Sequence, residues 1–253
     1  MTMACEVGHQ YGHSQDDTLQ VFEMHGAKYV NVDTTIFEGI MKAKSWNLTS
    51  SGFVDAIVVT SFLYDASELF SPNHRGKFFT VMRDPVERSV SLLNYLGQAK
   101  WERNYDPAFA SMTIEDFVRS GKVPNNWMVR WLSNQRDGLI SEDHLIQAKE
   151  ILREKFVIGI LSQLDKSFQH FEKYFSWQII NRPFRKKCVE ELIAVGANRN
   201  PLPHQLPITA KGYEALVQQN ELDIQLYRYA EQLFAQQSTY FDGVPRPLVG
   251  TLK

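Results

Sequence analysis

This sequence lacks several features that would assign it at once to a broad class of protein. It has no run of about 20 apolar residues, so it offers no candidate for a membrane-spanning helix. Two cysteines in 253 residues are too few for a disulfide framework, and their pairing cannot be deduced. A formal net charge of −2 excludes a general electrostatic attraction to nucleic acid or anionic membranes. No internal repeat or low-complexity tract is present.

The N-terminal part of the chain carries only weak signals. The first 13 residues are polar and have no apolar centre of the kind found in signal peptides. Cys5, His9 and His13 are spaced so that a helix would place them on one face, where they could bind zinc. Because no fourth ligand accompanies them, we favour a surface segment without metal. Asn47-Leu48-Thr49 is a glycosylation sequon, which indicates a compartment only together with other signals.

What is present is the composition and patterning of a globular α/β domain. Hydrophobic residues make up 43% of the chain and charged residues 22%, enough for a sizeable core. Apolar runs rich in β-branched or aromatic residues predict strands, and helix patterns lie between the first three of them. This alternation predicts a parallel sheet with right-handed crossovers and helices on both faces. The predicted strands are Tyr29–Val32, Ala56–Thr60, Phe78–Met82 and Phe156–Ile160. The predicted helices among the first three strands are Thr35–Lys44, a short one near Ala66–Phe70, and Pro85–Leu96.

The second half of the chain is predicted to be mainly helical. Ser141 is expected to cap one helix, and Ser162–Asp165 fits a capping box for another. A last helix carries apolar residues on one face from Leu222 to Leu233. We therefore expect a single domain over residues 1–253, with an uncertain N-terminal segment at 1–28. A helical insertion at 101–154 and a Pro/Gly tail at 242–253 complete this division.

The segment Lys77–Tyr95 carries most of the chemical information. A buried strand is predicted to end at Arg83, Asp84 is a good N-cap, and Pro85 suits the first helical position. Ligands of open α/β sheets lie outside the carboxyl ends of the strands. An arginine there, with a hydroxyl such as Ser91 from the following helix, can hold a phosphate by charge-assisted hydrogen bonds. The alternative is that Arg83 pairs with Asp84 or a neighbouring helix and that Ser91 only packs.

A family resemblance favours the functional alternative. Arg83–Ser91, read as Arg-Asp-Pro-x-x-Arg-x-x-Ser, resembles the 3′-phosphate-binding motif of Golgi carbohydrate sulfotransferases, the group that includes heparan sulfate 2-O-sulfotransferase. Looser similarity extends from Tyr29 to Phe234 and includes Asn126–Arg130. The resemblance implies a P-loop NTPase-like sulfotransferase fold and 3′-phosphoadenylyl sulfate (PAPS) as co-substrate, without a metal. Arg83 and Ser91 correspond to the family residues that bind the 3′-phosphate of PAPS.

The sequence departs from this family at two points. The family has a Pro-Lys-x-x-[Ser/Thr] loop after its first strand to hold the 5′-phosphosulfate, and no such loop occurs here. The segments Gly26-Ala27-Lys28, Gly76-Lys77 and Gly121-Lys122 lack the surrounding pattern, and the same search excludes a Walker A NTPase. We therefore expect the fold to be incomplete at the N-terminus. Some relatives also carry a His-x-His-like element where this chain reads Val58–Phe62; no histidine or glutamate stands at that strand end here, so no catalytic base is assigned.

Two hypotheses follow from these residues. In the first, the chain is a sulfotransferase that moves a sulfuryl group from PAPS to a hydroxyl, chiefly of a carbohydrate. In the second, it is a non-catalytic or truncated relative that binds a nucleotide or a glycan. The resemblance implies a Golgi membrane or lumenal location for a full-length form, whereas the chain as written is expected to be soluble. The sequence identifies neither the acceptor nor the oligomeric state.

Overall fold

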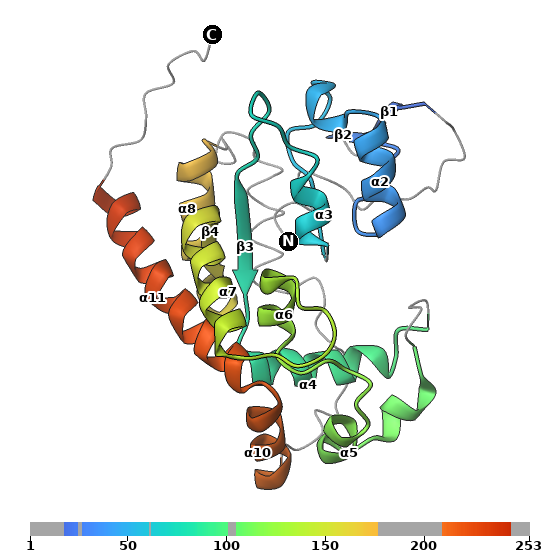
Figure 1. The fold of residues 1–253 in the computed structure, drawn as a ribbon, viewed down its shortest axis with the longest axis vertical. Helices are drawn as coiled ribbons and strands as arrows, with labels where there is room; N and C mark the ends of the chain where they lie inside the picture. The colour runs from blue at the N-terminus through green and yellow to red at the C-terminus, as the bar shows by residue number, and fades with distance from the viewer. Residues whose placement is uncertain (1–17, 25–26, 61, 101–104, 177–208, 244–253) are drawn as a thin grey trace. The chain divides into compact units, whose positions relative to one another are not determined.

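The structure is a computed structural model that describes residues 18–24, 27–60, 62–100, 105–176 and 209–243 (Figure 1). Its contacts divide the chain into two units, the first holding the described residues up to Phe78 and the second those from Phe79 onward. The elements of the first unit are β1 (Val21–Met24), β2 (Ala27–Val30), α2 (Phe37–Ser45), the 3₁₀ turn η1 (Leu48–Ser50) and α3 (Leu63–Ser67). Each unit is described by itself.

The second unit is mainly helical and carries the predicted motif. Its strands are β3 (Phe78–Met82), which begins at the unit boundary, and β4 (Phe156–Ile160). Its helices and 3₁₀ turns are α4 (Pro85–Leu96), η2 (Pro107–Ser111), α5 (Ile114–Arg119), α6 (Trp127–Ser133), α7 (Glu142–Lys155), η3 (Leu161–Gln163), α8 (Leu164–Phe175), α10 (Ala210–Gln219) and α11 (Glu221–Gly243). No described helix combines the length and the apolar character needed to cross a bilayer.

The first unit departs from the predicted parallel sheet. β1 and β2 form an antiparallel pair in which Val21 faces Val30 and Phe22 faces Tyr29. The Phe22 and Tyr29 rings lie 5.9 Å apart, a cross-strand aromatic contact that stabilises the pair. The prediction that Tyr29–Val32 joins a parallel sheet is therefore wrong. Its nearest partner is a preceding strand whose four residues carry too little pattern to be recognised.

The predicted strand Ala56–Thr60 is also wrong, because this segment is not a strand and belongs to neither sheet. The backbone carbonyl of Val58 accepts a hydrogen bond of 2.7 Å from the Thr34 hydroxyl. The Val58 side chain is 39% exposed, whereas Val59 packs against the cluster around Ile40. The β-branched run was read as a strand covered on both faces, but only one of its faces packs.

The second unit confirms the predicted alternation around β3 and β4. The two strands are neighbours in a parallel two-stranded sheet flanked by helices, and both have the predicted bounds. In the part of the chain that the structure describes, this parallel sheet has two strands rather than four. Helices α7, α8 and α11 pack against β4 (Figure 1). The described fold is thus mixed α/β with a small parallel sheet.

Some helices begin where local signals place them and others do not. The predicted helix Thr35–Lys44 is α2, which begins two residues later, and the short helix predicted near Ala66–Phe70 is α3, which begins three residues earlier. The α4 helix has the predicted bounds, and Asp84 caps it. Ser141 caps α7, with its backbone N–H donating to Nδ1 of His144 at 3.1 Å. The capping box predicted at Ser162 is wrong, because α8 starts two residues later, after a 3₁₀ turn, with Gln163 at its N-cap. A 3₁₀ turn shifts the helix start without changing the apolar stripe that the helix buries.

Two apolar clusters hold the second unit together. One surrounds the buried strand β4 and includes residues of α6, α7 and α11. The other joins α4, α5 and α10. The fully buried side chains with the largest volumes in these clusters are Leu93, Phe117, Leu145, Leu152, Ile158, Ile160, Leu216, Leu226 and Phe234. Because Met82 at the end of β3 belongs to the first cluster and Val86 at the start of α4 to the second, the segment that joins β3 to α4 links the two clusters.

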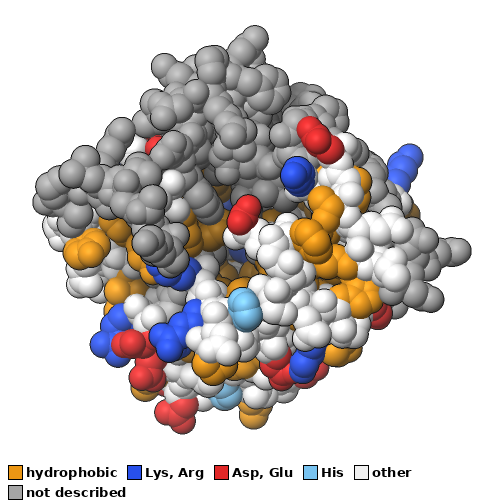
Figure 2. Space-filling view, turned by 90° about the horizontal axis from the view of Figure 1, so that it is seen from above, with side chains coloured by type: hydrophobic (Ala, Val, Ile, Leu, Met, Phe, Trp, Pro, Cys, Tyr) orange, Lys and Arg blue, Asp and Glu red, His pale blue; other side chains and the backbone are white. Residues whose placement is uncertain are grey.

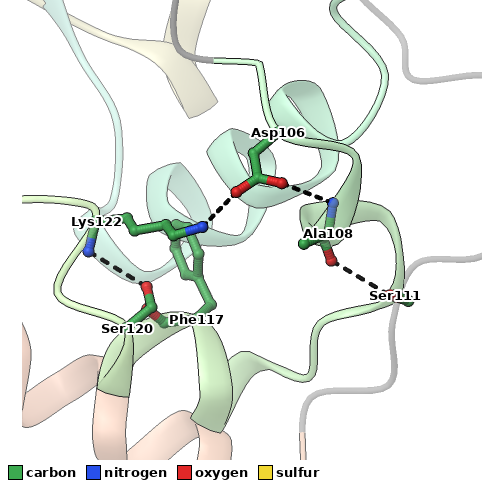
Figure 3. Close-up of polar contacts among 6 residues, drawn as sticks. All are labelled: Asp106, Ala108, Ser111, Phe117, Ser120 and Lys122. Atoms are coloured by element: carbon green, nitrogen blue, oxygen red, sulfur yellow. Dashed lines mark hydrogen bonds and ion pairs between the residues drawn. The ribbon is translucent and has the colours of Figure 1, made fainter.

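Polar contacts stabilise the segment between α4 and α6 (Figure 3). The Asp106 carboxylate accepts a 2.9 Å hydrogen bond from the Ala108 N–H and so caps η2. Its other oxygen accepts a hydrogen bond from Nζ of Lys122, and this contact lowers the pKa of Asp106. Basic, acidic and apolar side chains are interspersed on the face in Figure 2, as the small net charge leads one to expect.

Gly159→Ala is expected to lower the free energy of unfolding by about 1–3 kcal/mol, because β4 has no room for a methyl group there. A Cβ at this position would lie 2.7 Å from Cζ of Phe171 and 3.1 Å from the Thr80 carbonyl oxygen of β3. Urea denaturation measures the loss. Adding Phe171→Leu should recover part of it if the ring is the obstacle. An unchanged denaturation midpoint would contradict this close packing.

Candidate functional site

The candidate site begins where β3 ends. Met82 is buried at the end of the strand, and Arg83 is the first residue outside it. The Asp84 carboxylate then accepts hydrogen bonds from the N–H groups of Val86 at 2.9 Å and Glu87 at 3.0 Å. These bonds fix the turn from strand to helix, because they satisfy two N–H groups that the first helical turn leaves unpaired. The local structure predicted from Asp84 and Pro85 is therefore correct.

Arg83 lies partly exposed at this turn. Its side chain is 36% exposed, and its Nε lies 3.5 Å from Oε2 of Glu87, one helical turn along α4. Within the described residues this Nε is buried and has no hydrogen-bond partner. Of the two alternatives in the sequence analysis, the structure thus shows pairing with the helix, but the partner is Glu87 and not Asp84. A 3.5 Å ion pair leaves the guanidinium with donors that an oxyanion ligand can use.

The two serines of the motif have different surroundings. Ser89 is buried, and its hydroxyl donates to the Pro85 carbonyl at 2.8 Å and accepts from Nδ2 of Asn220 at 3.4 Å. Ser91 is half-buried, and its hydroxyl makes no hydrogen bond with the described part of the chain. Ser91 is therefore the motif serine whose hydroxyl remains available to a ligand.

Arg88, the second arginine of the motif, is engaged by other parts of the protein. Its guanidinium lies over the Trp127 ring, 4.2 Å from the ring centroid. Burial lowers the pKa of Arg88, while the negative charge of Asp223 opposes this shift. A cation stacked on an indole and partly removed from water holds α4 against α6. We therefore assign Arg88 a structural role.

Near Arg88, helices α6 and α11 cap each other's N-termini, which the sequence analysis did not predict. The buried Asp223 carboxylate of α11 accepts hydrogen bonds from the N–H groups of Met128 at 3.0 Å and Val129 at 2.8 Å, at the start of α6. In return, Oδ1 of Asn126 accepts from the N–H groups of Leu222 at 2.9 Å and Asp223 at 3.1 Å. Each helix thus supplies the cap of the other. The sequence does show a residue type that favours capping near the start of each helix, Asn126 for α6 and Asp223 for α11. It contains no signal that these two distant residues cap each other's helices.

The end of β4 brings further polar groups to the same edge of the sheet. Burial raises the pKa of the Tyr227 phenol on α11, and the nearby Ser162 hydroxyl opposes this shift. The negative charges of Glu231, Asp84 and Glu87 also raise this pKa. The surroundings of Arg83 therefore contain several carboxylates, and any anion bound there must compete with them.

The remaining predicted features contribute no further ligand contact. Lys122, one of the lysines considered for a phosphate loop, contacts Asp106 instead. The Cys5, His9 and His13 set lies outside the described residues. Among the residues that the structure describes, no group of three or more histidine, cysteine or acidic side chains could hold a metal ion.

Comparison of the chain with protein-family profiles, with curated proteins and with solved structures finds no match. The functional assignment therefore depends on the residues at the β3 edge and on the resemblance of their motif.

Proposed function

We propose that the β3–α4 turn binds the 3′-phosphate of a nucleotide and that the chain is a PAPS-dependent sulfotransferase. The observation that carries the proposal is the position of Arg83, a partly exposed guanidinium at the carboxyl end of a parallel strand. Its Nε has no hydrogen-bond partner among the described residues. The finer assignment to a P-loop NTPase-like sulfotransferase fold, and to a Golgi location, comes from the motif resemblance and belongs to the same proposal.

In this function Arg83 and Ser91 hold the donor. The guanidinium donates charge-assisted hydrogen bonds to the 3′-phosphate, and the Ser91 hydroxyl donates a further one. During transfer, the acceptor hydroxyl oxygen forms a bond to sulfur as the bond from sulfur to the 5′-phosphate oxygen breaks. The acceptor proton passes to a base, and 3′,5′-adenosine bisphosphate (PAP) leaves. The proposed acceptor is a carbohydrate hydroxyl, and the base is not assigned.

A second function is favoured by a specific feature of the sequence. No Pro-Lys-x-x-[Ser/Thr] loop is present to hold the 5′-phosphosulfate, and Lys122 contacts Asp106. Charge stabilisation of the leaving phosphate is commonly a large part of catalysis. Without it, the chain would bind PAP or PAPS but transfer sulfate slowly or not at all.

Wild-type protein is expected to bind PAP roughly ten- to hundredfold more tightly than AMP, because AMP lacks the 3′-phosphate that Arg83 and Ser91 address. Calorimetric titration with the two nucleotides measures this preference. A parallel assay with labelled PAPS measures sulfate transfer, which the sulfotransferase function requires and which the non-catalytic alternative predicts to be slow or absent. Equal affinities for PAP and AMP would refute the donor site, whereas rapid transfer would exclude the non-catalytic alternative.

A further inference from the structure

Glu87 occupies an unusual place beside the proposed phosphate site. Its carboxylate lies 3.5 Å from Nε of Arg83 and is 66% exposed. Its backbone N–H is already bonded to Asp84, which holds it in the first turn of α4. Arg83 is its only ion-pair partner among the described residues. The side chain that faces the proposed ligand-binding guanidinium is therefore an anion with no other described cation to neutralise it.

We propose that Glu87 occupies the anion position of Arg83 in the ligand-free protein and thereby competes with any phosphate that binds there. This inference rests on the proposed function. A ligand phosphate must take the place of the Glu87 carboxylate at the Arg83 guanidinium. The net free energy of binding is therefore the difference between the phosphate–Arg83 and the Glu87–Arg83 ion pairs. A phosphate monoester, which carries close to two negative charges near neutral pH, is attracted to the guanidinium more strongly than a phosphodiester, which carries one. The displaced Glu87 carboxylate also repels the monoester more strongly.

Other anions at this edge strengthen the competition but cannot replace Glu87. The Asp84 carboxylate is engaged with two helix N–H groups and so is held away from Arg83. Glu231, Asp84 and Glu87 together raise the pKa of the neighbouring Tyr227 phenol, in addition to the effect of burial. A ligand anion therefore meets repulsion here that its contact with Arg83 must overcome. Of these carboxylates, Glu87 is the one paired with the guanidinium.

Glu87→Gln is expected to bind PAP about two- to fivefold more tightly than wild type, because an exposed ion pair that opposes binding is removed. The gain should vanish in the Arg83→Ala background, where no guanidinium remains to be released. Calorimetric titration of wild type, both single variants and the double variant with PAP forms the complete cycle. Glu154→Gln is the matched control, since Glu154 pairs with Arg153 on α7 and its loss removes one negative charge elsewhere.

The outcomes separate this inference from the function on which it rests. Unchanged PAP affinity in Glu87→Gln, with a large loss in Arg83→Ala, would overturn the role of Glu87 and leave the donor site standing. A gain that persists without Arg83 would also overturn it, because Glu87 would then act by repelling the ligand directly. If wild type does not distinguish PAP from AMP, the function and this inference both fail.

A pair of ligands tests the selectivity itself. Adenosine 3′-phosphate and its methyl ester differ by one charge on the phosphate that faces Arg83. Wild type should prefer the monoester, and Glu87→Gln should increase that preference by about two- to fivefold, because the carboxylate charge that is removed repels the dianion more strongly than the monoanion. The same ratio of affinities in both proteins would contradict a selectivity role for Glu87.

Discussion

Arg83→Ala is expected to lower the affinity for PAP about ten- to hundredfold and to leave the affinity for AMP almost unchanged. A charge-assisted hydrogen bond contributes about 1.5–3 kcal/mol, which corresponds to that loss. The effect should be confined to PAP because Arg83 addresses the 3′-phosphate. The side chain is partly exposed and its one described ion pair is long, so the protein should remain folded. Titration with both nucleotides measures the change.

Two variants make this result interpretable. Ser91→Ala should lose less affinity than Arg83→Ala, since a neutral hydroxyl contributes less than a guanidinium. Arg153→Ala removes an exposed arginine on α7, which pairs with Glu154, and should leave PAP binding unchanged. A similar loss in Arg153→Ala would mean that the nucleotide responds to overall charge and not to the β3 edge. Retention of the PAP preference in Arg83→Ala would refute the assignment of Arg83.

Asp223→Ala is expected to lower the free energy of unfolding by about 2–4 kcal/mol at pH 5. The carboxylate caps α6 through bonds of 3.0 and 2.8 Å to the N–H groups of Met128 and Val129. Asp223 is fully buried, so water cannot easily replace these bonds. Above about pH 6, where Asp223 is ionised, its removal also takes a negative charge away from the stacked Arg88. Urea denaturation followed by circular dichroism measures the loss.

The cost of Asp223→Ala should also depend on pH. Burial raises the pKa of Asp223 to about 6, although the two N–H groups and the charges of Arg88 and Arg130 oppose this shift. The carboxyl pKa in the unfolded chain is about 3.9, so the folded state binds the proton more tightly. The corresponding stability is fully present below about pH 4 and is lost as pH rises through about 6. The difference between wild type and Asp223→Ala should therefore be larger at pH 5 than at pH 8.

Asn126→Ala provides the matched control for this pH effect. Asn126 makes the reciprocal cap on α11 with a neutral amide, through bonds of 2.9 and 3.1 Å. Its loss should lower stability by about 1–2 kcal/mol to the same extent at both pH values. If the cost of Asp223→Ala instead grew from pH 5 to pH 8, the helix N–H groups and arginines would dominate over burial.

The sequence by itself determined the elements whose signals are local. Pro85–Leu96 was predicted with its observed bounds because Asp84 and Pro85 specify a helix start within three residues. Phe78–Met82 and Phe156–Ile160 were predicted because each is a short apolar run beside a clear helix signal. The position of Arg83 at a strand end follows directly from these bounds. The availability of its side chain does not.

Only the tertiary structure decided which elements pair and which side chains stay available. Ala56–Thr60 carries the pattern of a strand, yet a strand needs a hydrogen-bonding neighbour, and Val58 bonds to the Thr34 hydroxyl instead. Arg88 and Ser91 share one helix, but contact with Trp127 engages the first and leaves the second available. Asp223 and Met128 are 95 residues apart in sequence. Their contact arises from the packing of α11 against α6. Local sequence patterns do not encode this packing, because capping preferences specify which residue types cap a helix but not which helix they cap.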